Sequence, residues 1–203
     1  MPDTQHAPPD RILIIGCGAI AREILALKEA NGWDHLDLTC VPAIYHNHPE
    51  KIPGAVRELH AKHHNAYDRI DVAFADCGTG GLLQNVCDEL GMAMIAGPHC
   101  YAFFQGAAAP PPEDDMTAFY LTDFLVRQFD AFVWKPLGLD RHPELRDMYF
   151  SHYERLIYLA QVPDPELDAR ARDCAQRLGL AFERRETGFG GLADWMATRA
   201  TPA

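Results

Sequence analysis

The sequence predicts an α/β protein with a Rossmann-like parallel sheet, helices on both faces of the sheet and a helical insertion. Short apolar runs rich in β-branched residues alternate with segments whose apolar residues recur at helical spacing. Glycine-rich turns follow the first and third of these runs. Because parallel strands need long crossover connections, which are usually helical, this alternation favours a parallel sheet.

Six strands are predicted, at residues 11–15, 36–41, 70–75, 92–96, 155–162 and 180–185. Helices are predicted at residues 19–30, 53–65, 82–90, 143–153 and 164–178. Between the fourth and fifth strands, residues 106–115 are rich in alanine, proline and acidic residues, and residues 116–135 have helical periodicity. We interpret residues 106–153 as a proline-rich break followed by a helical insertion.

The length of 203 residues predicts one α/β domain over residues 11–195, with tails at residues 1–10 and 196–203. Hydrophobic residues make up 48% of the chain, which is enough for a packed core. The net charge of −11 argues against nucleic acid and membrane surfaces as partners. No apolar run is long enough to span a bilayer and the first residues lack a signal-peptide core, so we expect a cytoplasmic protein that acts on a small molecule.

Three of the six cysteines follow predicted strands, where parallel strands place their ligand-binding loops. They are Cys17, Cys77 and Cys100, whereas Cys40, Cys87 and Cys174 lie within predicted elements. Thiolates suit zinc or an iron–sulfur cluster, and a fourth position would be filled by His99, His46, His48, water or substrate. The alternative is that the cysteines are packing residues, since cysteine is among the most frequently buried residue types.

Two glycine-rich turns are candidate cofactor-binding segments. The run from Gly16 through Gly18 to Ala21 fits G-x-G-x-x-A between a strand and a helix, which could place a pyrophosphate at the helix N-terminus and is the basis of the alternative of an NAD(P)-binding oxidoreductase. No acidic residue follows the second strand to bind a ribose, and Asp37 lies inside that strand. The second turn, with Gly78 and Gly80, could cradle a phosphate or carboxylate but lacks the lysine of a P-loop.

Two side chains beside these cysteines are candidates for proton transfer or for ligand support. His99 adjoins Cys100 and could be a metal ligand or an acid–base group. Asp76 adjoins Cys77 and could orient a ligand, act as a base or cap the following helix. The sequence leaves these roles open.

Several short motifs together resemble a known prokaryotic family, domain of unknown function 1638, from about residue 11 to about residue 190. The motifs are Cys17-Gly18-Ala19-Ile20, Asp76-Cys77-Gly78, His99-Cys100-Tyr101, Phe119-Tyr120-Leu121-Thr122-Asp123-Phe124, and Gly138-Leu139-Asp140 with Tyr153. The resemblance implies a cytoplasmic α/β protein of a kind often encoded near corrinoid-dependent methyltransferases, corrinoid proteins and their reductive activators. It implies no particular reaction.

The leading hypothesis is a metal–thiolate protein in which Cys17, Cys77 and Cys100, with His99 nearby, hold zinc or an iron–sulfur cluster. It would serve corrinoid-linked one-carbon or methyl-transfer metabolism, either as a metal-dependent methyltransferase or beside one, with any corrinoid supplied by a partner protein. The alternatives are a non-catalytic accessory or metallochaperone subunit of a methyltransferase system and an NAD(P)-binding oxidoreductase.

Overall fold

Strand β1, Ile12–Cys17, is buried along its whole length and forms the centre of a three-stranded sheet. Its parallel neighbours are β2, Leu36–Val41, and β3, Arg69–Ala73, in the order β2-β1-β3. The continuous apolar run at the start of β1 is typical of a parallel strand covered on both faces. In this computed structural model residues 10–105 and 116–201 are described.

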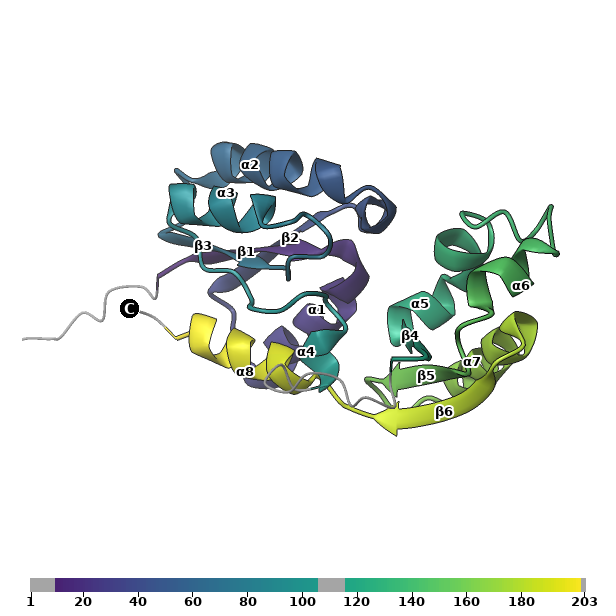
Figure 1. Ribbon diagram of the computed structural model, residues 1–203. Helices are drawn as coiled ribbons and strands as arrows, with labels where there is room; N and C mark the ends of the chain where they lie inside the picture. Colours follow the sequence, from purple (N-terminus) through teal and green to yellow (C-terminus); the bar gives the residue numbers. More distant parts are fainter. Residues whose placement is uncertain (1–9, 106–115, 202–203) are drawn as a thin grey trace, which may run out of the picture. The chain divides into compact units, whose positions relative to one another are not determined.

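The crossover helices cover both faces of this sheet. Helix α1, Ala21–Asn31, joins β1 to β2, and helix α2, Ile52–His63, joins β2 to β3 on the other side of β1. Right-handed crossovers that run in opposite directions along a sheet put their helices on opposite faces. Figure 1 shows this, with α3, Leu82–Leu90, beside α2, and with α8, Gly190–Arg199, on the face of α1.

The C-terminal segment is part of this packing rather than a tail. Met196 is fully buried and Ala200 is 3% exposed, so the tail predicted from residue 196 is wrong for residues 196–201. The guanidinium of Arg69 on β3 donates to the carbonyl of Arg199, and Nε2 of His35 lies 2.7 Å from the carbonyl of Ala200. These groups satisfy carbonyls at the end of α8 that have no partner within the helix. The predicted N-terminal tail, residues 1–10, lies outside the described residues except for residue 10.

A second three-stranded parallel sheet contains β4, Ala118–Thr122, β5, Arg155–Ala160, and β6, Ala181–Glu186, in chain order. Helix α7, Pro165–Leu178, joins β5 to β6. The connection from β4 to β5 contains α5, Asp123–Arg127, a π-helix, Asp130–Trp134, and α6, Leu145–Phe150. A short helix, α4, Ala102–Gln105, precedes the sheet.

The second sheet has a core on each face. Helices α5 and α7 pack on one face around Leu121, Tyr158 and Ala171, which are fully buried. The other face buries Ile157 and Leu159, with Tyr101 and Tyr120 packed against them. Neighbouring residues of β4 therefore face opposite cores, as the two-residue period of a strand requires.

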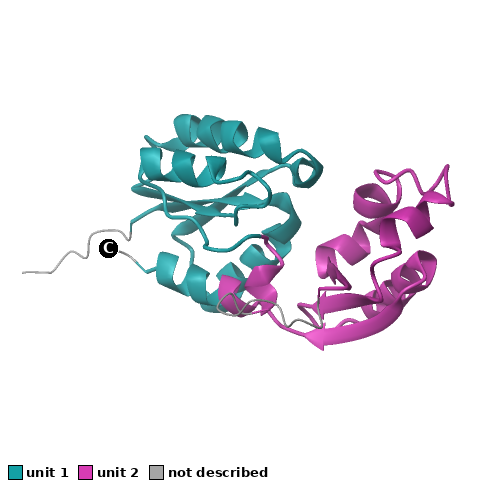
Figure 2. Cartoon of the chain, in the orientation of Figure 1, with its two compact units in different colours: residues 1–98, 193–203 teal, residues 99–192 magenta. Residues whose placement is uncertain are grey.

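The chain divides into two compact units, one of residues 1–98 and 193–203 and one of residues 99–192 (Figure 2). Each unit contains one of the two sheets. The predicted fold class, parallel α/β with helices around the strands, is confirmed, but the strands form two sheets rather than one. The single domain stays a prediction, and the proline-rich break at residues 106–115 lies outside the described residues.

Two predicted elements differ from the structure for identifiable reasons. Residues 118–122 form β4 instead of a helix, because pairing with β5 favours the extended conformation that their aromatic side chains also suit. Residues 92–96 make only an isolated bridge to β3, at Met94. The N–H of Ala93 is bonded to the buried carboxylate of Asp71 at 3.0 Å rather than to a strand. Among the described helices, none is long and apolar enough to cross a membrane.

Candidate functional site

Cys17 is the last residue of β1 and caps the 3-10 turn Gly18–Ile20 that leads into α1. Its sulfur accepts a hydrogen bond from the N–H of Ala19 at 3.4 Å. This bond orients the sulfur within the turn. The side chain is 6% exposed, so it also fits the packing alternative.

The glycines that flank Cys17 are explained by close packing within the protein. A Cβ on Gly18 would lie 3.0 Å from the backbone nitrogen of Ala43 and 3.2 Å from the carbonyl oxygen of Val41. A Cβ on Gly16 would lie 3.0 Å from Cδ1 of Ile24. The G-x-G spacing therefore has a structural reason that does not involve a pyrophosphate.

Asp37, the acidic residue of β2, is engaged at the opposite end of the strand from the glycine-rich turn. It pairs with Leu13 in the register of the sheet, near the start of both strands. Its carboxylate accepts hydrogen bonds from Arg11 at 3.0 Å and Tyr67 at 2.9 Å, and these lower its pKa against the effect of partial burial. Asp37 is thus part of a surface network, and this arrangement favours neither NAD nor NADP.

Cys77 has a positive φ of 47°, and it is the one non-glycine residue with a left-handed backbone in the described part of the chain. It lies in the turn after β3, where Gly78, Gly80 and Gly81 also have positive φ angles. The left-handed conformation costs a residue with a Cβ about 1–2 kcal/mol, and glycine avoids this cost. An outlier of this kind is a basis for a hypothesis of function.

Asp76 organises this turn. One carboxylate oxygen accepts the Gly81 N–H at 2.7 Å and the Thr79 hydroxyl at 3.0 Å, and the other accepts the Gly80 N–H at 3.1 Å. The bond from Gly81 is the main reason that the pKa of Asp76 lies below its usual value, although desolvation opposes it. A carboxylate held in this way is a poor base at neutral pH. It holds the turn and does not cap α3 directly, since the N–H of Leu83 in that helix donates to the hydroxyl of Thr79.

The same bonds change the interpretation of the second glycine-rich turn. Its amides form an anion-binding arrangement of the kind that cradles a phosphate. The amides of Gly80 and Gly81 already bind the carboxylate of Asp76. The turn therefore carries its own anion, and Gly80 does not need an external one.

Cys17 ends β1 and Cys77 lies in the turn after the neighbouring strand β3, so both are at the carboxyl edge of the first sheet that the sequence predicts for them. The N–H of Cys77 donates to the carbonyl of Pro98 at 2.9 Å, in the same compact unit. Cys100 and His99 follow Pro98 in the chain but belong to the other unit. There His99 stacks on Tyr101, with ring centroids 5.0 Å apart, and Tyr101 stacks on Tyr120 at 5.2 Å.

The remaining cysteines are buried or partly buried, and His48 lies beside an acidic residue. Cys87 and Cys174 are buried core residues, and burial raises the pKa of each thiol to about 11. Cys40 on β2 is partly buried, with its pKa also raised to about 11 by burial. His48 lies in the predicted loop, 3.6 Å from Glu50. Within residues 10–105 and 116–201, no group of three or more histidine, cysteine or acidic side chains is arranged to hold a metal ion.

The sequence does not reveal two features of the second unit. Buried Asp123 binds the hydroxyl of Tyr158 and the N–H of Gln161 at the carboxyl ends of β4 and β5. A cavity of about 270 Å³ lies between the α5 region and α7. Its lining residues are far apart in the sequence and form no motif, although the repeated arginines on one face of α7 are a signal that helical spacing could have provided.

The fold and the strand-end residues define a parallel α/β protein with cysteines at the carboxyl edge of its first sheet. Comparison with protein families matches residues 40–196 to the family described as "Protein of unknown function (DUF1638)". The match covers most of the chain, and the protein belongs to this family. It includes Cys77 and Cys100 but begins after Cys17. No curated protein matches the chain.

Proposed function

We propose that the protein binds a metal through cysteine thiolates, with Cys17 and Cys77 among the ligands, and that it serves methyl-group metabolism. The observation that carries the metal proposal is the left-handed backbone of Cys77, in a turn whose other left-handed residues are glycines. A glycine would adopt this conformation at lower cost, and this supports a role for the Cys77 side chain.

The two cysteines have complementary surroundings. Cys17 accepts an N–H bond in the turn after β1, and Cys77 is positioned by a turn that Asp76 holds in place. They follow adjacent parallel strands, where ligand sites of open sheets form. Two soft sulfur donors fit zinc or an iron–sulfur cluster better than they fit magnesium or calcium.

Two thiolates do not complete a coordination shell, and we propose Cys100 as the third ligand with His99 nearby. This assignment rests on the sequence, in which Cys100 follows residues 92–96, although in the structure these residues make a single bridge to β3 and not the predicted strand. A zinc ion held in this way, with one position open, would bind a substrate thiol as its thiolate and raise its reactivity toward a methyl donor. The assignment to methyl-group metabolism, with a corrinoid protein or methyltransferase as partner, rests on the family resemblance.

Metal analysis of the anaerobically purified full chain tests the site. We expect stoichiometric zinc or iron in the wild type and its loss in Cys17→Ser and Cys77→Ser. The control is Cys174→Ala, which removes a buried thiol from the core of the other unit and should retain the metal. A metal-free wild type, or unchanged occupancy in both serine variants, would contradict the proposal.

Two further measurements test the third ligand and the proposed methyl transfer. Loss of metal in Cys100→Ser supports the third ligand, whereas full occupancy removes Cys100 from the ligand set. Incubation of the metal-loaded protein with methylcobalamin and 2-mercaptoethanol, followed by cobalamin absorbance, tests methyl transfer. Turnover would identify an enzyme, and its absence together with co-purification of a methyltransferase would identify an accessory subunit.

A further inference from the structure

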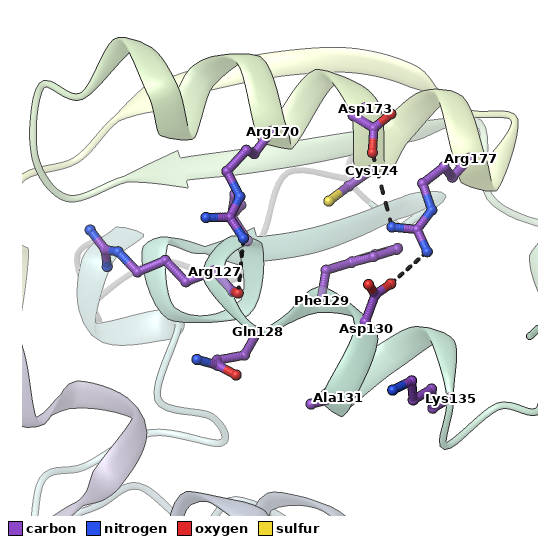
Figure 3. A pocket seen from close by; sticks show the side chains of 11 residues that line it. Arg127, Gln128, Phe129, Asp130, Ala131, Lys135, Arg170, Asp173, Cys174 and Arg177 are labelled. Carbon is purple, nitrogen blue, oxygen red and sulfur yellow. Dashed lines mark hydrogen bonds and ion pairs between the residues drawn. The ribbon is translucent and has the colours of Figure 1, made fainter.

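The cavity in the second unit is formed by α5, the π-helix that follows it and the long helix α7 (Figure 3). It has a volume of about 270 Å³ and lies between the segment that runs from α5 through the π-helix to Lys135 and the facing side of α7. Helix α7 contributes a single face, at positions 170, 173, 174 and 177, as helical spacing requires. All of these residues belong to the same compact unit.

The charged residues around the cavity are mainly cationic. Its cations are Arg127, Lys135, Arg170 and Arg177, and its acids are Asp130 and Asp173. The chain as a whole has a net charge of −11, so a cavity with an excess of positive charge differs from the rest of the protein. Such a cavity favours an anionic ligand.

The protein itself uses two of the four cations. Arg177 pairs with Asp130 at 2.5 Å and Asp173 at 4.0 Å, and its guanidinium lies 4.3 Å from the centre of the Trp134 ring. Arg127 lies 3.7 Å from the buried carboxylate of Asp123. These contacts neutralise both acids of the cavity and hold Arg177 in place.

The other two cations have no carboxylate partner in the described parts of the chain. Arg170 donates only to the backbone carbonyl of Arg127, at 3.2 Å, and Figure 3 shows its guanidinium extending from α7 toward the α5 side. Lys135 follows the π-helix and makes no ion pair with the residues around it. Figure 3 draws the two cations at different ends of the cavity, so the binding of one anionic group by both requires the exposed Lys135 side chain to turn toward Arg170.

The π-helix is a second, independent pointer to a ligand. A π turn disturbs the regular helical hydrogen bonding and is found frequently at functional sites. Here it occupies Asp130–Trp134, between two residues that line the cavity, Phe129 and Lys135. It sets the position of the wall from which Lys135 extends.

We propose that this cavity binds the phosphate group of a small molecule, with Arg170 and Lys135 as the charged groups that recognise it. A phosphomonoester carries about 1.5 to 2 negative charges near neutral pH and offers three acceptor oxygens, which match an arginine fork and a lysine ammonium. The volume lies just below the usual range of ligand pockets, so the ligand is a small metabolite and not a dinucleotide. Ala131 is exposed, but Phe129 is buried beneath Arg177, so the cavity offers little apolar surface to the remainder of an ester.

Titration of the full chain with inorganic phosphate and with phenyl phosphate, at constant ionic strength in potassium chloride, tests this site. We expect saturable binding in calorimetry or phosphorus NMR, weakened about tenfold by Arg170→Gln or Lys135→Gln. Both side chains are exposed, so the variants should retain the wild-type melting temperature. Tighter binding of the ester identifies a phosphorylated metabolite, and equal binding identifies free phosphate.

The control is Arg141→Gln, which makes the same change of charge in the same unit, at a side chain that is 74% exposed and outside the cavity. It should leave the affinity unchanged. Absence of saturation with both probes, or equal weakening by the control and the cavity variants, would overturn the proposal. The test requires no metal, so its result is independent of the proposed cysteine site.

Discussion

The hydroxyl of Tyr158 donates a hydrogen bond of 2.7 Å to the carboxylate of Asp123, and both side chains are buried. Asp123 begins α5 directly after β4, and Tyr158 lies on the neighbouring strand β5. The N–H of Gln161 reaches the same carboxylate oxygen at 3.1 Å, and the amide oxygen of Gln161 accepts the N–H of Asp123 at 2.7 Å. This network joins the ends of two strands and holds the start of α5.

Replacing Tyr158 with phenylalanine should lower the free energy of unfolding by about 1–3 kcal/mol, because it removes a buried hydrogen bond to a charged group. Burial, and then the bond to Asp123, raise the pKa of Tyr158, so the hydroxyl stays a proton donor at all physiological pH values. Urea denaturation measures the change. Tyr149→Phe removes a hydroxyl from a side chain that is 40% exposed and should change stability little, so equal effects would contradict the prediction.

Asp76 should make the protein sensitive to acid. Its folded-state pKa lies below the ordinary value of 3.8, so its contribution to stability is present above that value and is lost as pH falls through the folded pKa. Asp76→Asn should therefore be less stable than the wild type at pH 7, and the difference should shrink below about pH 4. Denaturation at a series of pH values measures this. Asp88→Asn, an exposed change on α3, should show no such convergence.

The backbone of Cys77 should be strained. At a φ of 47°, Cys77→Gly should be more stable than Cys77→Ala by about 1 kcal/mol, since both variants lack the sulfur but only alanine retains a Cβ. Urea denaturation in the presence of a chelator measures this without a contribution from bound metal. An alanine variant as stable as the glycine variant would show that the turn tolerates a Cβ, and would remove the main support for a functional role of the thiol.

Gly18 should be required for packing. Gly18→Ala places a Cβ 3.0 Å from the backbone nitrogen of Ala43, where neither segment can move without disturbing β1 or β2, and should cost about 1–3 kcal/mol. Gly54→Ala is the matched control, because a Cβ at this position in α2 meets nothing within 4 Å and alanine favours a helix. The control should be neutral or slightly stabilising. A stable Gly18→Ala variant would mean that the glycine serves some purpose other than packing.

Much of the fold could be predicted because local patterns report local structure. The apolar run of β1 and the helical spacing of α7 depend on which faces of each element are buried, and burial leaves a periodic trace in the sequence. Residues 116–135 were predicted incorrectly where β4 forms, because their aromatic residues suit both a strand and an apolar helix.

The candidate site, too, could be predicted from the sequence only in part. The position of Cys17 and Cys77 at the carboxyl ends of β1 and β3 follows from the order of strands and turns, although Cys17 is the last residue of β1 and does not follow it. The left-handed backbone of Cys77 and the hydrogen bonds that the glycine amides donate to Asp76 have no sequence signature, since they depend on how one turn closes. The cavity beside Arg170 and Lys135 likewise needs segments that are 35 or more residues apart to meet.

The sequence by itself determined the alternation of strands and helices, the parallel α/β class, the family resemblance and the cysteines that end up at strand ends. These depend on local periodicity, on the topology of parallel strands and on residue identity. Only the tertiary structure decided that the strands form two sheets and that cations gather in a cavity on the second unit. It alone also showed that the carboxylate of Asp76 accepts the glycine N–H groups of its own turn. Strand pairing and side-chain convergence are set by contacts between distant residues, which no local pattern specifies.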